Sequence, residues 1–374
     1  LRVRRTTTLL SAAGIGLVTA IFATVLALAE GFRSTQAGMG DPEVAVVLRE
    51  GSTSAINSLI TREQVRIMSS MTELAGTDAY SPEVVIIFQL PTADGEGEAN
   101  VLVRGVSATA FAVHRNVRII AGRAIDPTRH EVMVGRAAAT RYMGMRLGST
   151  FRQAGVTWRV VGIFEAGGSG FESEIWGDDV KTMDAFKREN YSMISARLRD
   201  PGLLGAFAAR VRDDRRLALL ARNEVDYYAE QAEQTTGMLK GLGIFVTSIL
   251  AIGAIFGAVN TMYASVGART AEIATLRAIG FRRRDILLSF MIEAAFIGLL
   301  GGLLGCVLTI PMNGVSTAVM NFQSFSDLAF KFRVTPDILV SAVVWAILMG
   351  AVGGFFPAVR AVRLPIAAAF RDVA

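Results

Sequence analysis

Lysine, histidine and cysteine are scarce in this chain of 374 residues. Its only lysines are Lys181, Lys187, Lys240 and Lys331, and none follows a glycine. A Walker A loop needs a Gly-Lys pair, because that lysine reaches the β- and γ-phosphates of ATP. The chain is therefore not expected to bind ATP by such a loop. A single cysteine, Cys306, excludes a disulfide framework.

Patterns for catalysis or metal binding are also missing. The two histidines, His114 and His130, have no cysteine partner, and His130-Glu131 lacks the second histidine of a zinc-protease helix. We expect both to be polar surface residues. A solvated acidic loop is expected to hold the carboxylates Glu172, Glu174, Asp178 and Asp179. The sequence thus predicts no catalytic site, no metal site and no cofactor in this chain.

Charge is absent from four long stretches, residues 6–29, 241–268, 294–326 and 338–359. A spanning helix needs about 20 apolar residues, because the hydrocarbon core is about 30 Å thick. We therefore predict transmembrane helices at Thr8–Ala29, Leu242–Tyr263, Ile286–Ile310 and Ile338–Phe356. Core helices of a large soluble protein are the alternative, but such helices rarely run 20 residues without a charge.

The first stretch also fits a signal peptide cleaved after Ala27-Leu28-Ala29. The apolar region of a signal peptide has about 7–15 residues, whereas Leu9–Leu28 spans 20. A retained membrane anchor is therefore favoured. The chain begins with Leu1 rather than methionine, so we expect further residues to precede it.

Positive charge gathers on one side of the predicted membrane. Four helices place both termini and the 264–285 loop on the same side, which carries eleven arginines against three acidic residues. Short cytoplasmic loops are rich in Lys and Arg, so both termini are predicted to be cytoplasmic. The net charge of +5 then marks orientation, not nucleic-acid binding. The arginines are Arg2, Arg4, Arg5, Arg269, Arg277, Arg282, Arg283, Arg284, Arg360, Arg363 and Arg371.

The large segment between helices 1 and 2 reads as an extracytoplasmic α+β domain. Thr61 and Gln64 fit a capping box before a helix that ends near Leu74. A helical pattern resumes near Glu230 and continues into the second span, which predicts a projecting stalk, with Gly237 among the residues that could bend it. β-branched runs predict strands at Val44–Leu48, Val84–Leu90, Val101–Val106, Thr157–Phe164 and Ser192–Leu198.

These elements define the predicted fold class: a membrane α-helical protein with four transmembrane helices and a large α+β extracytoplasmic domain inserted between helices 1 and 2. The predicted boundaries are residues 1–29 for the first helix, 30–229 for the domain, 230–263 for the stalk and second helix, 264–285 for the cytoplasmic loop, and 286–374 for the last two helices and tail.

The 264–285 loop is the most informative segment. It is helix-prone, and Gly280 is a natural stop because glycine tolerates the left-handed conformation. Arg269 and Glu272 are three residues apart and can pair. Two interpretations stay open: an interfacial amphipathic helix on lipid phosphates, or a docking helix for a soluble partner.

Residues of this loop carry a family resemblance. Arg269-x-x-Glu272-Ile273-x-x-Leu276-Arg277-Ala278-Ile279-Gly280 resembles a signature of the FtsX/MacB-like ABC transporter permeases, although Ala268 and Ala274 depart from it. The glycine-rich run 298–305 is similar to that family's third helix, and Glu131–Gly135 with Trp158–Ile163 to its periplasmic core domain. With no nucleotide-binding domain in these residues, the arrangement resembles LolC/LolE-type lipoprotein-sorting permeases and DevC-type exporters.

The resemblance implies a dimeric permease of the bacterial inner membrane, made of two copies or of one copy and a paralogue. ATP and Mg would be bound by a separate cytoplasmic ATPase, and mechanotransmission would work the periplasmic domain for export, efflux or lipoprotein extraction. A periplasmic adaptor, an outer-membrane channel and membrane lipid are further implied partners. The alternative function is an FtsX-like signalling scaffold that controls a cell-wall hydrolase.

Two sets of site residues follow. The resemblance implies that ATPase coupling falls to Arg269, Glu272, Ile273, Leu276, Arg277, Ala278, Arg282, Arg283 and Arg284. Glycines spaced four apart let membrane helices approach closely, which predicts helix packing at Gly253, Gly257, Gly298, Gly301, Gly302, Gly305, Gly350 and Gly354. The only acid well inside a predicted span, Glu293, is expected to be a structural hydrogen-bonding group.

Overall fold

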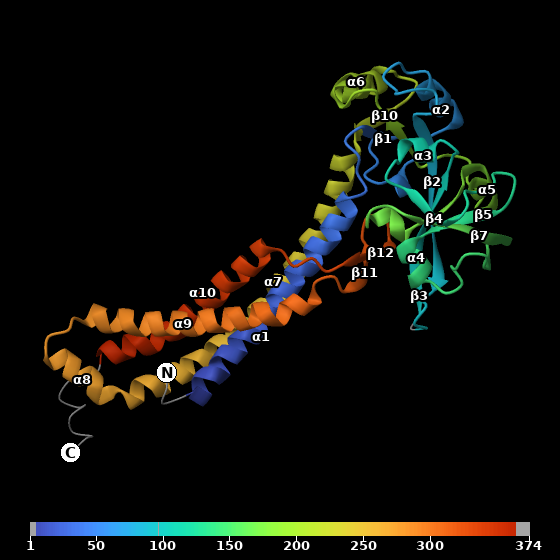
Figure 1. Ribbon diagram of the computed structural model, residues 1–374. Coiled ribbons are helices and arrows are strands. Elements are labelled where there is room, and N and C mark those ends of the chain that lie inside the picture. Colours follow the sequence, from blue (N-terminus) through green and yellow to red (C-terminus); the bar gives the residue numbers. More distant parts are fainter. Residues whose placement is uncertain (1–4, 96, 364–374) are drawn as a thin grey trace. The chain divides into compact units, whose positions relative to one another are not determined.

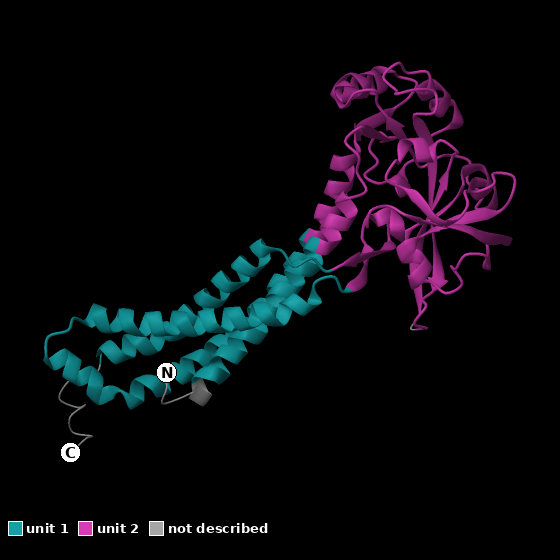
Figure 2. Cartoon of the chain, in the orientation of Figure 1, with its two compact units in different colours: residues 1–30, 237–315, 332–374 teal, residues 31–236, 316–331 magenta. Residues whose placement is uncertain are grey.

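The computed structural model describes residues 5–95 and 97–363 and forms two compact units (Figure 2). The helical unit takes the described parts of residues 1–30, 237–315 and 332–374, and the α+β unit takes those of 31–236 and 316–331. Of the eleven arginines predicted on the cytoplasmic side, Arg2, Arg4 and Arg371 lie outside the described residues.

The helical unit confirms the four predicted spans. Among the described residues, four helices are long and apolar enough to cross a membrane. They are α1 (Arg5–Ala37), α7 (Glu224–Ala268), α9 (Arg283–Thr309) and α10 (Pro336–Arg363) (Figure 1). Between α7 and α9 the chain forms the short helix α8 (Thr270–Ala278), and a 3₁₀ turn, η4 (Ile310–Met312), follows α9.

Two helices are longer than their apolar patterns. Helix α1 continues through Ala27–Ala29 to Ala37. Helix α7 begins six residues before the predicted start and runs 45 residues, about 68 Å, without a break at Gly237. The earlier start has a local cause, because the Asn223 side chain accepts the amide of Val225 at 2.8 Å and so caps the helix.

The α+β unit is built on a ten-stranded sheet. Nine strands follow the order β10-β1-β9-β2-β3-β8-β5-β7-β4, and the tenth, β6, pairs with β7 off this path. Most pairs are antiparallel, but β3 with β8 and β5 with β7 are parallel. All five predicted strands are present. The strands are β1 (Val44–Arg49), β2 (Tyr80–Pro91), β3 (Glu98–Val106), β4 (Arg118–Gly122), β5 (Glu131–Gly135), β6 (Thr150–Gln153), β7 (Val156–Glu165), β8 (Ile175–Asp178), β9 (Met193–Arg197) and β10 (Leu219–Asn223).

Short helices connect and cover these strands. They are α2 (Arg62–Ser69), α3 (Ala110–Val113), α4 (Arg136–Arg141), α5 (Asp179–Ala185) and α6 (Leu204–Asp213), with 3₁₀ turns η1 (Ala55–Asn57), η2 (Gly170–Ser173) and η3 (Pro201–Leu203). The predicted capping box is confirmed at α2: the Thr61 hydroxyl accepts the Gln64 amide at 3.2 Å, and the Gln64 side chain accepts the Thr61 amide at 2.8 Å.

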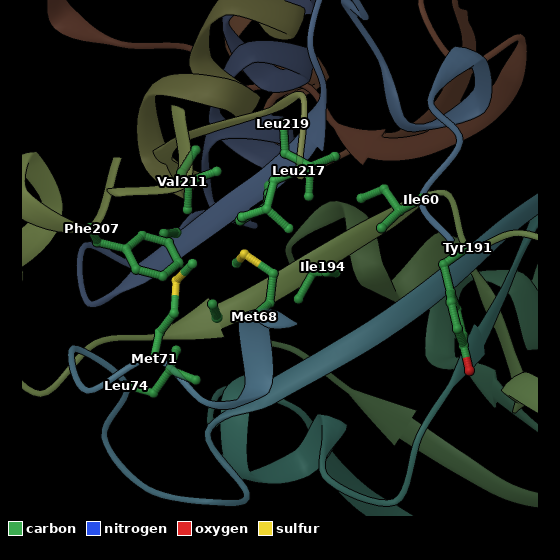
Figure 3. Packing of buried hydrophobic residues seen from close by; sticks show 14 of the residues in the cluster. Ile60, Met68, Met71, Leu74, Tyr191, Ile194, Phe207, Val211, Leu217 and Leu219 are labelled. Atoms are coloured by element: carbon green, nitrogen blue, oxygen red, sulfur yellow. The ribbon is translucent and has the colours of Figure 1, made fainter. Parts of the chain in front are cut away.

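Figure 3 shows how one end of the sheet acquires its core. Met68 of α2 and Phe207 of α6 lie over Ile194 of β9 and Leu219 of β10, and all four are buried. Burying each such side chain contributes roughly 1.5–3 kcal/mol. The two helices therefore hold β1, β9 and β10 together, next to the point where α7 begins.

A β-hairpin between α9 and α10 belongs to the α+β unit. Its strands are β11 (Ser316–Asn321) and β12 (Ser326–Lys331). Arg141 bridges to Asp327 at 2.6 Å, and the Asn100 amide donates to the Phe325 carbonyl at 2.8 Å. Phe330 packs edge-on against Phe32. The predicted boundaries placed this segment with the membrane helices, whereas it packs on the sheet far upstream in the sequence.

Candidate functional site

Helix α8 has well-defined ends. It starts after Arg269 and ends in a Schellman motif, with Gly280 at φ +106°. The Phe281 amide donates to the Leu276 carbonyl at 3.1 Å, and the Gly280 amide donates to the Arg277 carbonyl at 3.3 Å. These two bonds satisfy carbonyls that a helix end leaves unpaired. The predicted helix and its stop at Gly280 are therefore present.

One face of α8 is covered by the chain's own membrane helices. Ile273 and Ala274 are buried, and Ile273 packs in the same cluster as Ile286 of α9 and Ala358 of α10. The other side is open: Leu276 is 39% exposed, Phe281 is 50% exposed and Ile279 is 68% exposed. Besides these apolar side chains, Glu272, Thr275 and Ala278 are also exposed on the open side.

Two arginines tie α8 to the membrane helices. The Arg269 guanidinium donates to the Glu293 carboxylate of α9 at 3.0 Å, and Arg277 donates to the Val362 carbonyl of α10 at 3.1 Å. Arg269 therefore pairs with Glu293 rather than with Glu272, the partner that its spacing had indicated. An unpaired carboxylate inside a span is costly, which explains the choice. Glu293 thus has the hydrogen-bonding role expected of it.

The coupling residues implied by the resemblance therefore divide into two sets. Arg269, Ile273 and Arg277 are engaged within the helical unit. Glu272, Leu276, Ala278, Arg282, Arg283 and Arg284 lie on the exposed side. Ile279 and Phe281 also belong to the exposed surface. Sequence reasoning missed their accessibility, although both flank the Gly280 stop, where a chain reversal turns side chains outward.

The predicted packing glycines also divide into two sets. A Cβ added at Gly298 or Gly302 would meet α10 at 2.6 and 3.0 Å, and one added at Gly350 would meet α9 at 2.6 Å. Gly354 likewise faces α9, while Gly301 and Gly305 face α1. These six positions therefore carry close helix contacts within the chain.

Gly253 and Gly257 differ from those six. Outside the glycine's own helix, no described residue lies within 4 Å of a Cβ added at either position, and the same holds for Gly14 of α1. The three glycines line part of a groove of about 380 Å³ between α1 and α7, with Ser11 and Thr261 hydrogen-bonded across it at 2.6 Å. This groove is an open, small-residue surface on the helical unit.

A buried cluster of charges lies in the α+β unit where α7 begins. Arg104 of β3 contacts Glu83 of β2 at 2.7 Å and Glu174, which follows η2, at 2.6 Å. His114, at the end of α3, contacts the other oxygen of Glu83 at 2.8 Å. Glu224, the first residue of α7, lies 3.8 Å from the second ring nitrogen of His114. All five side chains are buried.

This cluster overturns two expectations from the sequence. His114 is a buried ion-pair residue rather than a polar surface residue, and Glu174 is buried against Arg104 rather than solvated. Glu172 and Asp179 are buried as well. The cause is the parallel pairing of β3 with β8, which brings Arg104 opposite Trp176. Such long-range pairing leaves no local sequence signal.

The surroundings of Glu83 and Glu224 shift the pKa values of these two carboxylates in opposite directions. Burial would raise the pKa of Glu83, but His114 and Arg104 outweigh it and lower that pKa to about 2. Burial raises the pKa of Glu224 to about 7, because His114 and the Asp41 amide only partly offset it. Burial would lower the pKa of His114, but Glu83 and Glu224 raise it overall. Across residues 5–95 and 97–363, no three His, Cys, Asp or Glu side chains gather as metal ligands.

Comparisons with known proteins identify both units. The FtsX-like permease C-terminal family matches residues 244–366, and the MacB-like periplasmic core domain family matches residues 8–214. An ABC transporter permease of Methanocaldococcus jannaschii is 34% identical over 140 residues, which are 36% of this chain and 35% of that protein. The macrolide export ATP-binding/permease protein MacB of Burkholderia thailandensis is 29% identical over 301 residues, 74% of this chain and 44% of that protein.

The chain thus spans less than half the length of these curated relatives. The solved periplasmic region of MacB from Actinobacillus actinomycetemcomitans aligns with 53% of this chain and 94% of its own, at 11% identity and a TM-score of 0.39. The two family matches follow the order of the α+β unit and the last three membrane helices. This chain is a multi-pass membrane protein that belongs to the FtsX/MacB-like family of ABC transporter permeases.

Proposed function

We propose that this chain is the permease subunit of an ATP-driven ABC transporter in the inner membrane, with both termini in the cytoplasm. A separate cytoplasmic ATPase, which binds ATP and Mg, docks on α8 and moves the membrane helices. The α+β unit lies outside and acts on the cargo by mechanotransmission, in export, efflux or lipoprotein extraction. The observation that carries the proposal is the exposed apolar side of α8.

That exposed side favours a protein partner over a lipid surface. An interfacial helix buries a single apolar face in lipid, but the Ile273 face of α8 is already covered by the chain's own helices. What stays open is a mixed surface, in which Leu276, Ile279 and Phe281 lie near Glu272 and three consecutive arginines. Apolar anchors rimmed by charge are typical of protein interfaces.

The connections of α8 supply a route for motion. Arg269 and Arg277 fix its two ends to α9 and α10, respectively. A displacement of α8 by the ATPase is therefore passed to both helices instead of being absorbed by a loose loop. Helix α9 leads through η4 into the hairpin of the α+β unit, and α10 follows that hairpin.

We also propose that a second permease copy occupies the groove between α1 and α7. Glycines on both helices leave room for a third helix backbone, and close backbone approach is what drives helix association in lipid. The most apolar part of α7 is also less buried within the chain than the corresponding parts of α1, α9 and α10.

Co-purification tests the docking proposal. Leu276→Asp combined with Ile279→Asp places charge in the apolar surface of α8, and we expect the ATPase subunit to be lost from the purified complex. Leu147→Asp, at an exposed leucine of the α+β unit, is the matched control and should retain it. Retention of the ATPase by the α8 double variant, with full ATP hydrolysis, would contradict the docking site.

A further inference from the structure

The first residue of the long helix α7 is a buried carboxylate. One Glu224 oxygen accepts the Asp41 amide at 3.0 Å. The other has no hydrogen-bond partner among the described residues, and the nearest charged atom is the His114 ring nitrogen at 3.8 Å. A buried ionised carboxylate is costly unless it is paired and hydrogen-bonded, and Glu224 accepts a hydrogen bond, from a neutral backbone amide, on only one of its oxygens.

The groups around Glu224 come from four other segments. They are His114 at the end of α3, Glu83 of β2, Arg104 of β3, and Glu174 before β8, while Tyr228 lies one turn further along α7. With His114 protonated, Arg104 balances one glutamate and His114 balances the other. Glu224 is then the surplus carboxylate, and the cluster is neutral only when Glu224 carries a proton.

We propose that His114 and Glu224 form a proton-operated clasp, which holds the first turn of α7 on the sheet firmly when Glu224 is protonated and loosens as the pH rises. In the ionised state the surplus charge repels Glu83 and Glu174 inside a low-dielectric core, and opening the turn to water relieves that repulsion. The surrounding pairs of Arg104 stay matched in both states.

A small cavity borders the cluster. Arg104, Glu174 and Tyr228 line a cavity of about 50 Å³ together with residues of the β11–β12 hairpin. A water molecule needs about 10–15 Å³ of such space, so the cavity has room for a few. The Tyr228 hydroxyl is buried and has no partner among the described residues, so it can hold water there. Water in this cavity would contact the cluster at Arg104 and Glu174, which line it.

The range of pH follows from linkage. Glu224 has a pKa of about 7 in the folded chain against 4.5 as its ordinary value. Between these values the closed turn holds a proton that the open turn releases, so the opening constant rises about tenfold per pH unit and levels off above about pH 7. The pKa of Glu224 is raised because its carboxylate is buried and only one of its oxygens accepts a hydrogen bond.

Hydrogen exchange on the full chain in lipid nanodiscs tests the clasp. Protection of amides 228–236, corrected for the intrinsic exchange rate, should fall about tenfold per pH unit between about pH 5 and 7. Glu224→Gln is neutral at every pH and should keep high protection across that range. Glu230→Gln, an exposed glutamate on the same helix, is the matched control and should follow the parent chain. Equal slopes in Glu224→Gln and the parent chain would refute the clasp.

A second variant covers the case in which Glu224→Gln fails to fold. His114 lowers the pKa of Glu224 in the folded chain, so in His114→Gln the fall in protection should continue to a higher pH before it levels off. Levelling off at the same pH as in the parent chain would also overturn the proposal. Neither measurement needs the ATPase, so failure of the proposed transport function would not affect the result.

Discussion

Arginines account for most of the specific polar architecture of this chain at the scale of single residues. Arg104 is fully buried and makes a bidentate contact with Glu174 while also holding Glu83. Arg269 does the equivalent for the helical unit by pairing with Glu293. A planar guanidinium with several donors suits such sites better than lysine does, which fits the scarcity of lysine in the sequence.

Charge reversal at one ion pair separates docking from coupling. Arg269→Glu places a carboxylate next to Glu293, so we expect the ATPase to stay bound while transport-coupled stimulation of ATP hydrolysis falls at least tenfold. The double variant Arg269→Glu, Glu293→Arg restores the attraction and should recover most of the stimulation. If Arg269 instead contacts the ATPase, the single variant will lose the subunit and the double variant will not regain it.

Acid stability depends on Glu83. Its folded pKa of about 2 lies below the ordinary 4.5 because His114 and Arg104 outweigh burial, so its stabilisation is complete above about pH 4.5 and is lost as the pH falls towards 2. The shift corresponds to about 3 kcal/mol. In unfolding followed by tryptophan fluorescence, Glu83→Gln should be less stable than the parent at pH 6 and should lose less between pH 5 and 3. An equal loss of stability between pH 5 and 3 in Glu83→Gln and in the parent would contradict this.

At the scale of elements, helices α7 and α9 show two uses of glycine. On α9, a Cβ added at Gly298 or Gly302 would meet α10, whereas on α7 a Cβ added at Gly253 or Gly257 would meet no other described helix within 4 Å. Identical spacing in the sequence therefore serves contacts within the chain in one helix and leaves an open face in the other. Spacing alone cannot tell these cases apart, because it does not show which neighbour a helix face meets.

The β11–β12 hairpin gives a prediction at the element scale. Asp327→Ala removes the ion pair between Arg141 and Asp327, and both of these side chains are less than one-third exposed. We expect a loss of about 1 kcal/mol of local stability, seen as roughly fivefold faster hydrogen exchange across residues 316–331. Lys331→Ala, an exposed site at the end of β12, should leave the rate unchanged. Unaltered exchange in Asp327→Ala would show that the aromatic contact of Phe330 suffices.

Local patterns made much of the fold predictable, and distant pairing made the rest unpredictable. The four spans, the strand at Val44 and the capping box at Thr61 each depend on neighbouring residues in the chain. The burial of Glu174 does not, because its partner Arg104 lies 70 residues away. The hairpin also escaped prediction, since Ser316–Asn321 lacks a strong strand pattern and the hairpin is stabilised by contacts of Phe325 with Asn100 and of Asp327 with Arg141.

At the scale of the whole molecule, the proposed dimer gives the clearest test. Gly253→Leu with Gly257→Leu fills the groove between α1 and α7 with two bulky side chains, so we expect the dimer fraction in nanodiscs to fall severalfold in cross-linking or mass photometry. Gly267→Leu, also on α7 and also open in the described structure, serves as the control. Unchanged dimerisation of the double variant would assign the groove to lipid.

The hairpin has a consequence for synthesis of the protein. The α+β unit takes most of its strands from residues 44–223, but its last two strands emerge from the ribosome only with residues 316–331, after α7, α8 and α9. Until then, the surfaces around Phe32 and Asn100 that receive the hairpin stay uncovered. In the proposed orientation, completion of this unit therefore waits until the candidate spans α7 and α9 have been made and inserted, which makes membrane insertion a checkpoint for folding of the α+β unit.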